Sequence, residues 1–169
     1  MLDFLWSVFH VALFLSIVLP YMMYTWAYKF PRHFKNHWTQ DQLVQRSASV
    51  KSVCFALYLI LCLKSGFNLS AIPIAIPCIA AGQLLNYLVF QKLGKVRAYY
   101  GWELGLDRGA EQKGFPFNLG HAQYKGCLLS LLGTFFLFQT NVELTVVTGI
   151  WAFMYFYMII LESSPCGKI

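Results

Sequence analysis

Long runs of apolar residues constrain this chain more than any other feature of its sequence. The first run covers residues 5–28, and further runs cover 50–63, 70–93, 127–138 and 143–161. A helix rises about 1.5 Å per residue, so about 20 apolar residues can cross a hydrocarbon core of about 30 Å. The pattern therefore predicts an all-α integral membrane protein.

The composition also favours a membrane-embedded fold. Hydrophobic residues make up 58% of the 169 residues and charged residues 12%, which is too apolar for an ordinary soluble domain. We expect a single membrane-embedded domain, residues 1–169, with four to five transmembrane helices. The number stays open because the run at 127–138 reaches span length only when residues 123–125 are added.

Positive charge is distributed unevenly along the chain. Lys and Arg number 13 against 7 Asp and Glu, and most of the excess lies in residues 29–51 and 92–125. The connecting segments 65–71 and 139–142 hold no Lys or Arg. Basic segments beside apolar spans indicate a membrane surface rather than nucleic acid, and such segments usually face the cytosol. With five spans, the last helix ends on the same face as segment 92–125.

The signatures of common soluble enzymes are absent from this sequence. It has no P-loop, no nucleophile elbow, no dinucleotide fingerprint and no zinc-ligand spacing, so we expect no metal. Polar residues and glycines gather instead toward one membrane face. They are Gly82 and Asn86 in the third run, the segments 98–103 and 114–126, and Glu162 at the end of the last run.

Two motifs in the glycine-rich segment resemble the phospholipid methyltransferase family. They are Gly-Phe-Pro-Phe-Asn at 114–118 and His-Ala-Gln-Tyr-Lys-Gly at 121–126. The resemblance extends over residues 80–163 and includes the paired tyrosines of segment 94–101 and the sequence Leu-Glu-Ser at 161–163. Within the family, the chain looks closest to the small phosphatidyl-N-methylethanolamine N-methyltransferases.

The resemblance implies a function and a location. Such enzymes use S-adenosylmethionine to methylate phospholipid head groups. We therefore expect N-methylation of phosphatidyl-N-methylethanolamine and of its dimethyl form, which gives phosphatidylcholine. The implied partners are a phospholipid substrate and the bilayer, and the oligomeric state stays open. The implied location is the endoplasmic reticulum membrane, with a catalytic loop and active site that face the cytosol.

The family's cofactor motifs transfer to this sequence in part. Its Gly-x-Gly motif reads Ala80-Ala81-Gly82 here, and its paired acidic residues read Glu162-Ser163. A carboxylate at the end of a span can accept hydrogen bonds from ribose hydroxyls or pair with an ammonium group. The implied cofactor-binding residues are Ala80, Gly82, Tyr100 and Glu162.

The remaining polar and aromatic residues provide candidates for catalysis and substrate binding. Histidine titrates near neutral pH, so His121 can take up the proton that the substrate amine must lose. Aromatic rings attract sulfonium and methylated ammonium groups. The predicted catalytic residues are His121, Tyr124 and Glu162. The predicted substrate-binding residues are Asn86, Tyr99, Trp102, Phe115, Phe117 and Asn118. The bases that we expect near the lipid phosphate are Arg97, Arg108, Lys113 and Lys125.

The same residues also have other interpretations. Gly82 is the kind of small residue that lets two transmembrane helices approach closely. Aromatic residues at 99–102 and 115–117 are typical of a membrane interface. An isoprenylcysteine carboxyl methyltransferase-like enzyme is the alternative function, with the same methyl donor and a prenylated peptide as substrate. A non-enzymatic multispan scaffold is the third hypothesis, but it does not explain why polar residues and glycines gather on one face.

Overall fold

A computed structural model describes residues 2–107 and 112–164 of the protein. The helices of this part of the chain are α1 (Leu2–Lys29), α2 (Pro31–His37), α3 (Gln40–Ser65), α4 (Ile72–Ala98), α5 (Ala122–Leu137) and α6 (Val142–Ser163), with short 3-10 helices η1 (Leu69–Ala71) and η2 (Phe117–Leu119). An isolated bridge between Phe67 and Phe138 is the one β-type contact of the described residues. The predicted all-α fold is confirmed.

Four helical segments are long and apolar enough to cross a membrane. They are Phe4–Lys29, Gln40–Ser65, Leu69–Ala98 and Val142–Ser163. Helix α5 has 16 residues and spans about 24 Å at the usual rise, which is less than a full hydrocarbon core. The expected four to five helices are thus four long ones and a shorter fifth.

Helix α3 begins ten residues earlier than its apolar run at 50–63. The side chain of Thr39 accepts a hydrogen bond from the amide of Gln42, and the side chain of Gln42 accepts one from the amide of Thr39. This capping box starts the helix in polar sequence. The first turns of α3 are therefore helical although they are too polar for the membrane interior.

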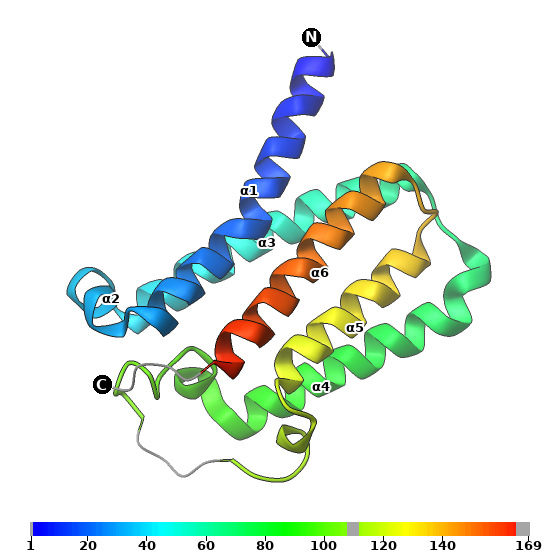
Figure 1. Ribbon diagram of the computed structural model, residues 1–169. Helices are drawn as coiled ribbons and strands as arrows, with labels where there is room; N and C mark the ends of the chain where they lie inside the picture. The colour runs from blue at the N-terminus through cyan, green and yellow to red at the C-terminus, as the bar shows by residue number, and fades with distance from the viewer. Residues whose placement is uncertain (1, 108–111, 165–169) are drawn as a thin grey trace.

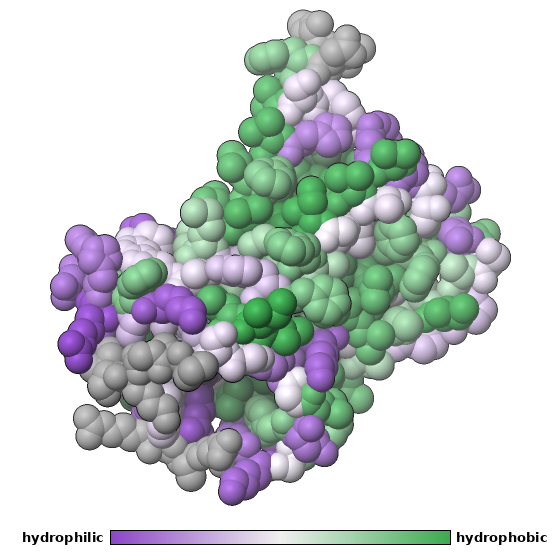
Figure 2. Space-filling model, in the orientation of Figure 1, coloured by the Kyte–Doolittle hydropathy of each residue, from purple (hydrophilic) through white to green (hydrophobic). Residues whose placement is uncertain are grey.

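The helices form a row in which each packs on its neighbour. Helix α5 packs against α4, α6 packs against α5 and α1, and α1 packs against α3 (Figure 1). The surface over the middle of the helices is apolar, and polar residues gather near α2 (Figure 2). This distribution fits a protein whose sides contact lipid and whose ends contact water.

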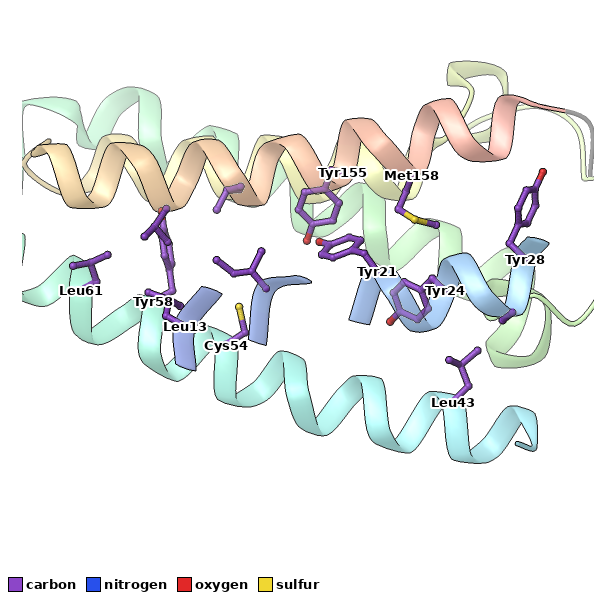
Figure 3. Packing of buried hydrophobic residues seen from close by; sticks show 14 of the residues in the cluster. Leu13, Tyr21, Tyr24, Tyr28, Leu43, Cys54, Tyr58, Leu61, Tyr155 and Met158 are labelled. Carbon is purple, nitrogen blue, oxygen red and sulfur yellow. The ribbon is translucent and has the colours of Figure 1, made fainter. Parts of the chain in front are cut away.

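The core lies between α1, α3 and α6. Its largest fully buried side chains include Tyr21, Tyr58 and Leu13 (Figure 3). Two of the hydroxyl groups inside it are paired across helices: Tyr58 shares a 2.8 Å hydrogen bond with Thr148, and Trp151 donates to the Tyr21 hydroxyl at 3.0 Å. Such pairing is what burial of a polar group away from water requires.

Helices α4 and α5 approach each other closely at glycines. A Cβ atom on Gly82 would lie 2.3 Å from the Ser130 hydroxyl and 2.5 Å from the Gly126 carbonyl oxygen. A Cβ atom on Gly133 would lie 2.8 Å from the carbonyl oxygen of Ala75. Small residues therefore set the distance between these two helices.

Candidate functional site

The ends of several helices meet at one end of the molecule. The loop after α4 lies beside the start of α5 and the end of α6 there (Figure 1), and α2 is at the same end. The Gln40 side chain donates to the carbonyl oxygens of Val96 at 2.6 Å and Tyr99 at 2.7 Å, which joins the start of α3 to the end of α4. Residues far apart in sequence are brought together at this end.

Glu162 lies at the centre of a cluster of hydroxyl groups. The Tyr100 hydroxyl donates to Glu162 Oε1 at 2.8 Å, and the Tyr124 hydroxyl donates to the same oxygen at 2.5 Å. The two phenol oxygens are 3.2 Å apart. The carboxylate is therefore held by two neutral donors that come from the loop after α4 and from the first turn of α5.

His121 covers the other side of the Glu162 carboxylate. Its Nδ1 lies 3.7 Å from Glu162 Oε2, and its Nε2 lies 3.0 Å from the Ser163 hydroxyl. His121 precedes α5 in a left-handed backbone conformation with φ +48°. The predicted catalytic residues His121, Tyr124 and Glu162 thus lie together, and Tyr100 lies with them.

The local backbone after α4 places Tyr100 toward Glu162. Tyr100 has φ +61°, which is uncommon for a residue with a Cβ atom. The amide of Gly101 donates to the Val96 carbonyl at 2.9 Å, and a Cβ atom at Gly101 would lie 2.6 Å from that oxygen. Glycine is therefore required at position 101 for the chain to turn back and present Tyr100.

Ionisable groups beside Glu162 are perturbed by burial. Burial, together with the neighbouring Tyr124 and Glu162, holds the pKa of the Tyr100 phenol well above its usual range, so this phenol stays a hydrogen-bond donor. Burial also raises the pKa of the Glu103 carboxyl, and the nearby Glu162 carboxylate adds to the effect while Arg97 opposes it. Perturbed groups of this kind often mark functional sites.

Two tyrosines of α1 belong to this end of the molecule, and the sequence analysis missed their role. The Tyr28 hydroxyl donates to the carbonyl oxygens of Glu162 at 3.2 Å and Ser164 at 3.0 Å. The rings of Tyr24 and Tyr28 each lie 5.9 Å from the ring of Tyr100, measured between ring centres. The spacing of tyrosines 21, 24 and 28 along one helix face was the signal that could have indicated a shared role.

One protein family matches the part of the chain that holds this cluster. The model of the family described as phospholipid methyltransferase matches residues 70–169. The chain belongs to the phospholipid methyltransferase family. The matched segment includes Tyr100, His121, Tyr124 and Glu162, which are the residues that form the cluster.

A curated relative matches a shorter part of the chain. A protein of Arabidopsis thaliana named phosphatidyl-N-methylethanolamine N-methyltransferase is 34% identical over 89 residues. The match covers 52% of this chain and 51% of that protein, so the chain spans about half the length of the relative. No solved structure matches.

The family's glycine motif occupies a different environment from the Glu162 cluster. Gly82 faces α5 and is covered by Gly126 and Ser130, so helix packing alone accounts for a glycine here. Ala80 is exposed on the outside of α4. None of the contacts described above joins Ala80 or Gly82 to Glu162.

Asn86 lies between α4 and the start of α5. Its Oδ1 is 3.6 Å from the Cys127 sulfur, and it lines a cavity of about 560 Å³ together with Gln83 and Ser130. Gln83 donates to the Ser130 hydroxyl at 3.0 Å. Gln83 and Asn86 thus line one cavity, and Asn86 is half-buried whereas Gln83 is exposed.

The other predicted substrate-binding residues lie around the cluster rather than in it. The ring of Tyr99 is half-buried and packs 6.2 Å from the rings of Tyr24 and Phe90. The side chains of Trp102, Phe115 and Asn118 are exposed, and that of Phe117 is half-buried. The carbonyl of Phe115 accepts a hydrogen bond from Lys92 at 2.5 Å, which ties this loop to α4.

Two of the four bases expected near a lipid phosphate have other partners. Arg97 forms an ion pair with Asp107 at 3.5 Å. Lys125 donates to the carbonyl of Leu119, and Lys113 is exposed. Arg108 lies outside the described residues. Among the described residues, no group of three His, Cys, Asp or Glu side chains is placed to hold a metal ion.

The arrangement is suited to a cationic ligand. It presents a carboxylate, phenol rings and a histidine at the end of an apolar helix, and none of the ion pairs found among the described residues joins Glu162 to a lysine or arginine. A carboxylate without a permanent counter-charge attracts cations strongly when water is partly excluded. Sulfonium and methylated ammonium groups are such cations, and aromatic rings add to their attraction.

Proposed function

We propose that this protein transfers a methyl group from S-adenosylmethionine to phosphatidyl-N-methylethanolamine and to its dimethyl form, giving phosphatidylcholine. Membership of the phospholipid methyltransferase family and the name of the Arabidopsis relative support this substrate class. The observation that carries the proposal is the carboxylate of Glu162 between the hydroxyls of Tyr100 and Tyr124, with His121 beside it.

The cluster fits a positively charged methyl donor. S-adenosylmethionine supplies an activated methyl group on a sulfonium, so the protein mainly has to hold the acceptor nitrogen in line with it and exclude water. Glu162 contributes the negative charge, and Tyr100 keeps that carboxylate oriented through its 2.8 Å hydrogen bond. Tyr24 and Tyr28 contribute electron-rich rings around Tyr100.

His121 is the proposed proton acceptor. A protonated amine has no lone pair for attack, so its proton must leave before the methyl group is transferred. His121 Nδ1 lies 3.7 Å from Glu162 Oε2, so the imidazole is beside the carboxylate that we propose for the cationic ligand. The half-buried position of His121 allows it to pass the proton on to water.

The position of the cluster suits a lipid head group. Glu162 follows the apolar part of α6, so its carboxylate lies where a membrane span meets the interface. Nearly all described basic residues lie toward this end of the molecule, and the opposite end holds Lys64 in an ion pair with Glu143. Because basic segments usually face the cytosol, this distribution supports a cytosolic position for the cluster, and we propose the endoplasmic reticulum membrane as its location.

Residues before the family match belong to the same functional unit in this proposal. Tyr24 and Tyr28 of α1 contact Tyr100, and Gln40 of α3 anchors the loop that carries it. We therefore treat residues 1–169 as one membrane-embedded methyltransferase domain.

Methyl transfer from radiolabelled S-adenosylmethionine tests the proposal in membranes that express the chain. The acceptors are phosphatidylethanolamine, its monomethyl and dimethyl forms, and a farnesylcysteine analogue. We expect label in the dimethyl lipid and in phosphatidylcholine, and a loss of about 100-fold or more with Glu162→Gln. Glu143→Gln is the matched control, because Glu143 lies at the opposite end of α6.

The other outcomes contradict the proposal in distinct ways. Label in the farnesylcysteine analogue alone would indicate a carboxyl methyltransferase. No transfer to any acceptor by folded wild-type protein would indicate a non-enzymatic membrane protein. Equal activity of Glu162→Gln and wild type would remove Glu162 from the site.

A further inference from the structure

Helix α3 carries a lysine on its inward face. Lys51 lies four residues after Ser47 and three before Cys54, and both of these residues are buried. Residues three and four apart share one face of a helix, so Lys51 points into the bundle. It stands at the start of the apolar run 50–63, where α3 enters the membrane. This lysine lies outside the segment that the family model matches.

The Lys51 ammonium lies over two tyrosine rings. Its Nζ is 4.8 Å from the centre of the Tyr24 ring and 5.9 Å from the centre of the Tyr21 ring. Lys64 and Lys95 pair with carboxylates, but no carboxylate among the described residues forms an ion pair with Lys51. An ionisable residue inside a membrane bundle normally has a counter-charge or binds a ligand.

The hydroxyl of Tyr24 is the second unsatisfied group at this place. Tyr24 is 4% exposed, and its hydroxyl oxygen is buried without a hydrogen-bond partner among the described residues. Buried hydroxyls nearly always have a partner, and an exception requires an explanation. The Lys51 ammonium lies over the ring that carries this hydroxyl, 4.8 Å from the ring centre, so both groups are at the same place. An anion would satisfy both groups, because it accepts a hydrogen bond from each.

This pair lies next to the Glu162 cluster. The ring of Tyr24 is 5.9 Å from the ring of Tyr100, whose hydroxyl donates to Glu162. Figure 3 shows Tyr24 beside Tyr21 on α1, facing the space between α3 and α6. A place that attracts an anion therefore adjoins a place that attracts a cation. The head group of an aminophospholipid has the same order of charges, since two carbons join its phosphodiester to its amine.

We propose that Lys51 and Tyr24 bind the phosphodiester of the lipid substrate while its amine lies at the Glu162 cluster. The inference rests on the proposed function. Lys51 is partly exposed and has a flexible four-carbon side chain, so it can move to admit a phosphate between its ammonium and the Tyr24 hydroxyl. Two of the loop bases are less suited to this role, because Arg97 is paired with Asp107 and Lys125 is bound to a carbonyl. A third, Lys113, is exposed.

Acceptors with and without a phosphate test this inference. The two acceptors are phosphatidyl-N-methylethanolamine and 1,2-dioleoyl-3-(methylamino)propane, which carries the same secondary amine and no phosphate. For Lys51→Gln we expect kcat/KM with the phospholipid to fall by about tenfold or more, mainly through KM, because a charge-assisted hydrogen bond is lost. With the phosphate-free amine, kcat/KM should stay within about twofold of wild type.

Further variants separate phosphate binding from a structural role. Lys51→Arg keeps a cation and should restore most of the phospholipid activity. Tyr24→Phe should lower phospholipid kcat/KM by about three- to tenfold and phosphate-free amine kcat/KM by less, because the ring beside Tyr100 is kept. Lys64→Gln removes a lysine from the far end of α3 and serves as the matched control. An equal loss with both acceptors would overturn the inference and assign Lys51 to packing.

Lipid retention supplies a readout that does not depend on catalysis. Native mass spectrometry of the purified protein measures how much added phosphatidylcholine and diacylglycerol stays bound. We expect Lys51→Gln and Tyr24→Phe to retain less phosphatidylcholine than wild type and the same amount of diacylglycerol. Equal phosphatidylcholine retention would overturn the phosphate site. An inactive wild type that shows this difference would contradict the proposed reaction and leave the phosphate site standing.

Discussion

At the scale of single residues, the site depends on how Glu162 is held. Two phenols donate to one of its oxygens and His121 faces the other, so neutral hydroxyl donors fix the orientation of the carboxylate. A lysine or arginine at the same place would compensate that charge and weaken its attraction for a cation. Neutral donors at Glu162 therefore favour a cationic ligand.

Tyr124→Phe should lower methyl transfer without unfolding the protein. A hydrogen bond to a charged group contributes about 1.5 to 3 kcal/mol, so kcat/KM should fall by about 10- to 100-fold. The double variant with Tyr100→Phe should lose less than the product of the single losses, because both hydroxyls act on one oxygen. Tyr87→Phe, at an exposed tyrosine of α4, is the control. If the double variant lost kcat/KM by the full product of the two single losses, the Tyr100 and Tyr124 hydroxyls would act independently.

Glu103→Gln should stabilise the protein at neutral pH more than at acidic pH. The pKa of Glu103 is raised in the folded state, so below the ordinary glutamate pKa the residue is neutral in both folded and unfolded chains. As pH rises, Glu103 ionises first in the unfolded chain, so the free energy of unfolding of the wild type falls. The fall ends once the pH exceeds the pKa of Glu103 in the folded protein. Thermal unfolding of wild type and Glu103→Gln at about pH 4 and about pH 7.5 measures this. If the unfolding temperatures of wild type and Glu103→Gln differed by the same amount at both pH values, Glu103 would not be a buried carboxyl.

At the scale of helices, the contact between α4 and α5 positions the loop and the start of α5. Gly82 and Gly126 bring the two backbones together, and Tyr124 lies two residues before Gly126. The capping box at Thr39 acts similarly, because it orients Gln40 toward the loop after α4. Helix contacts outside the cluster thus determine where its hydroxyl groups lie.

Gly82→Val should disrupt the α4–α5 contact. The new Cβ atom would lie 2.3 Å from the Ser130 hydroxyl and 2.5 Å from a backbone oxygen, and the backbone cannot move aside cheaply. We expect a lower midpoint of thermal aggregation in size-exclusion chromatography of the detergent-solubilised protein. Ala81→Val changes the exposed neighbour and should leave the midpoint unchanged. A stable Gly82→Val protein that no longer binds S-adenosylmethionine would instead support the family's cofactor role for this glycine.

Across the whole molecule, α5 separates the end that holds the Glu162 cluster from the end that holds the turn before α6. It is shorter than the four long helices, yet it runs from the Glu162 cluster to the turn before α6 at the other end (Figure 1). The hydrogen bond from the Gln139 amide to the Gly66 carbonyl, 2.8 Å long, joins that turn to the α3–α4 connection. The cluster and these two connections therefore lie at opposite ends.

Cysteine labelling of sealed microsomes should place Lys113 and Thr140 on opposite sides of the membrane. Both residues are exposed, and α5 lies between them. The variants carry Cys166→Ser, so that Cys166 near the end of the chain does not react. A membrane-impermeant maleimide should label Lys113→Cys in intact vesicles and Thr140→Cys only after permeabilisation. Labelling of both positions from one side would show that α5 does not cross.

The features of this protein that could be predicted from sequence are those encoded by neighbouring residues in the chain. Apolar runs located the long helices, and the motifs at 114–118 and 121–126 indicated the family that residues 70–169 match. The sequence also placed Glu162, Tyr100, Tyr124 and His121 in one site, and they are in contact. It misplaced the start of α3, because apolarity marks the membrane boundary of a helix and a capping box marks its first turn.

Hydropathy indicated that helices embed this chain in a membrane, and the family resemblance indicated the centre of its candidate site, because apolar runs and motifs are local properties. The packed helices were needed to show that Gly82 faces α5, that Tyr24 and Tyr28 lie around Tyr100, and that Lys51 lies over the Tyr24 ring. Those contacts join different helices, so they depend on how the helices pack, and no local pattern of residues specifies that packing.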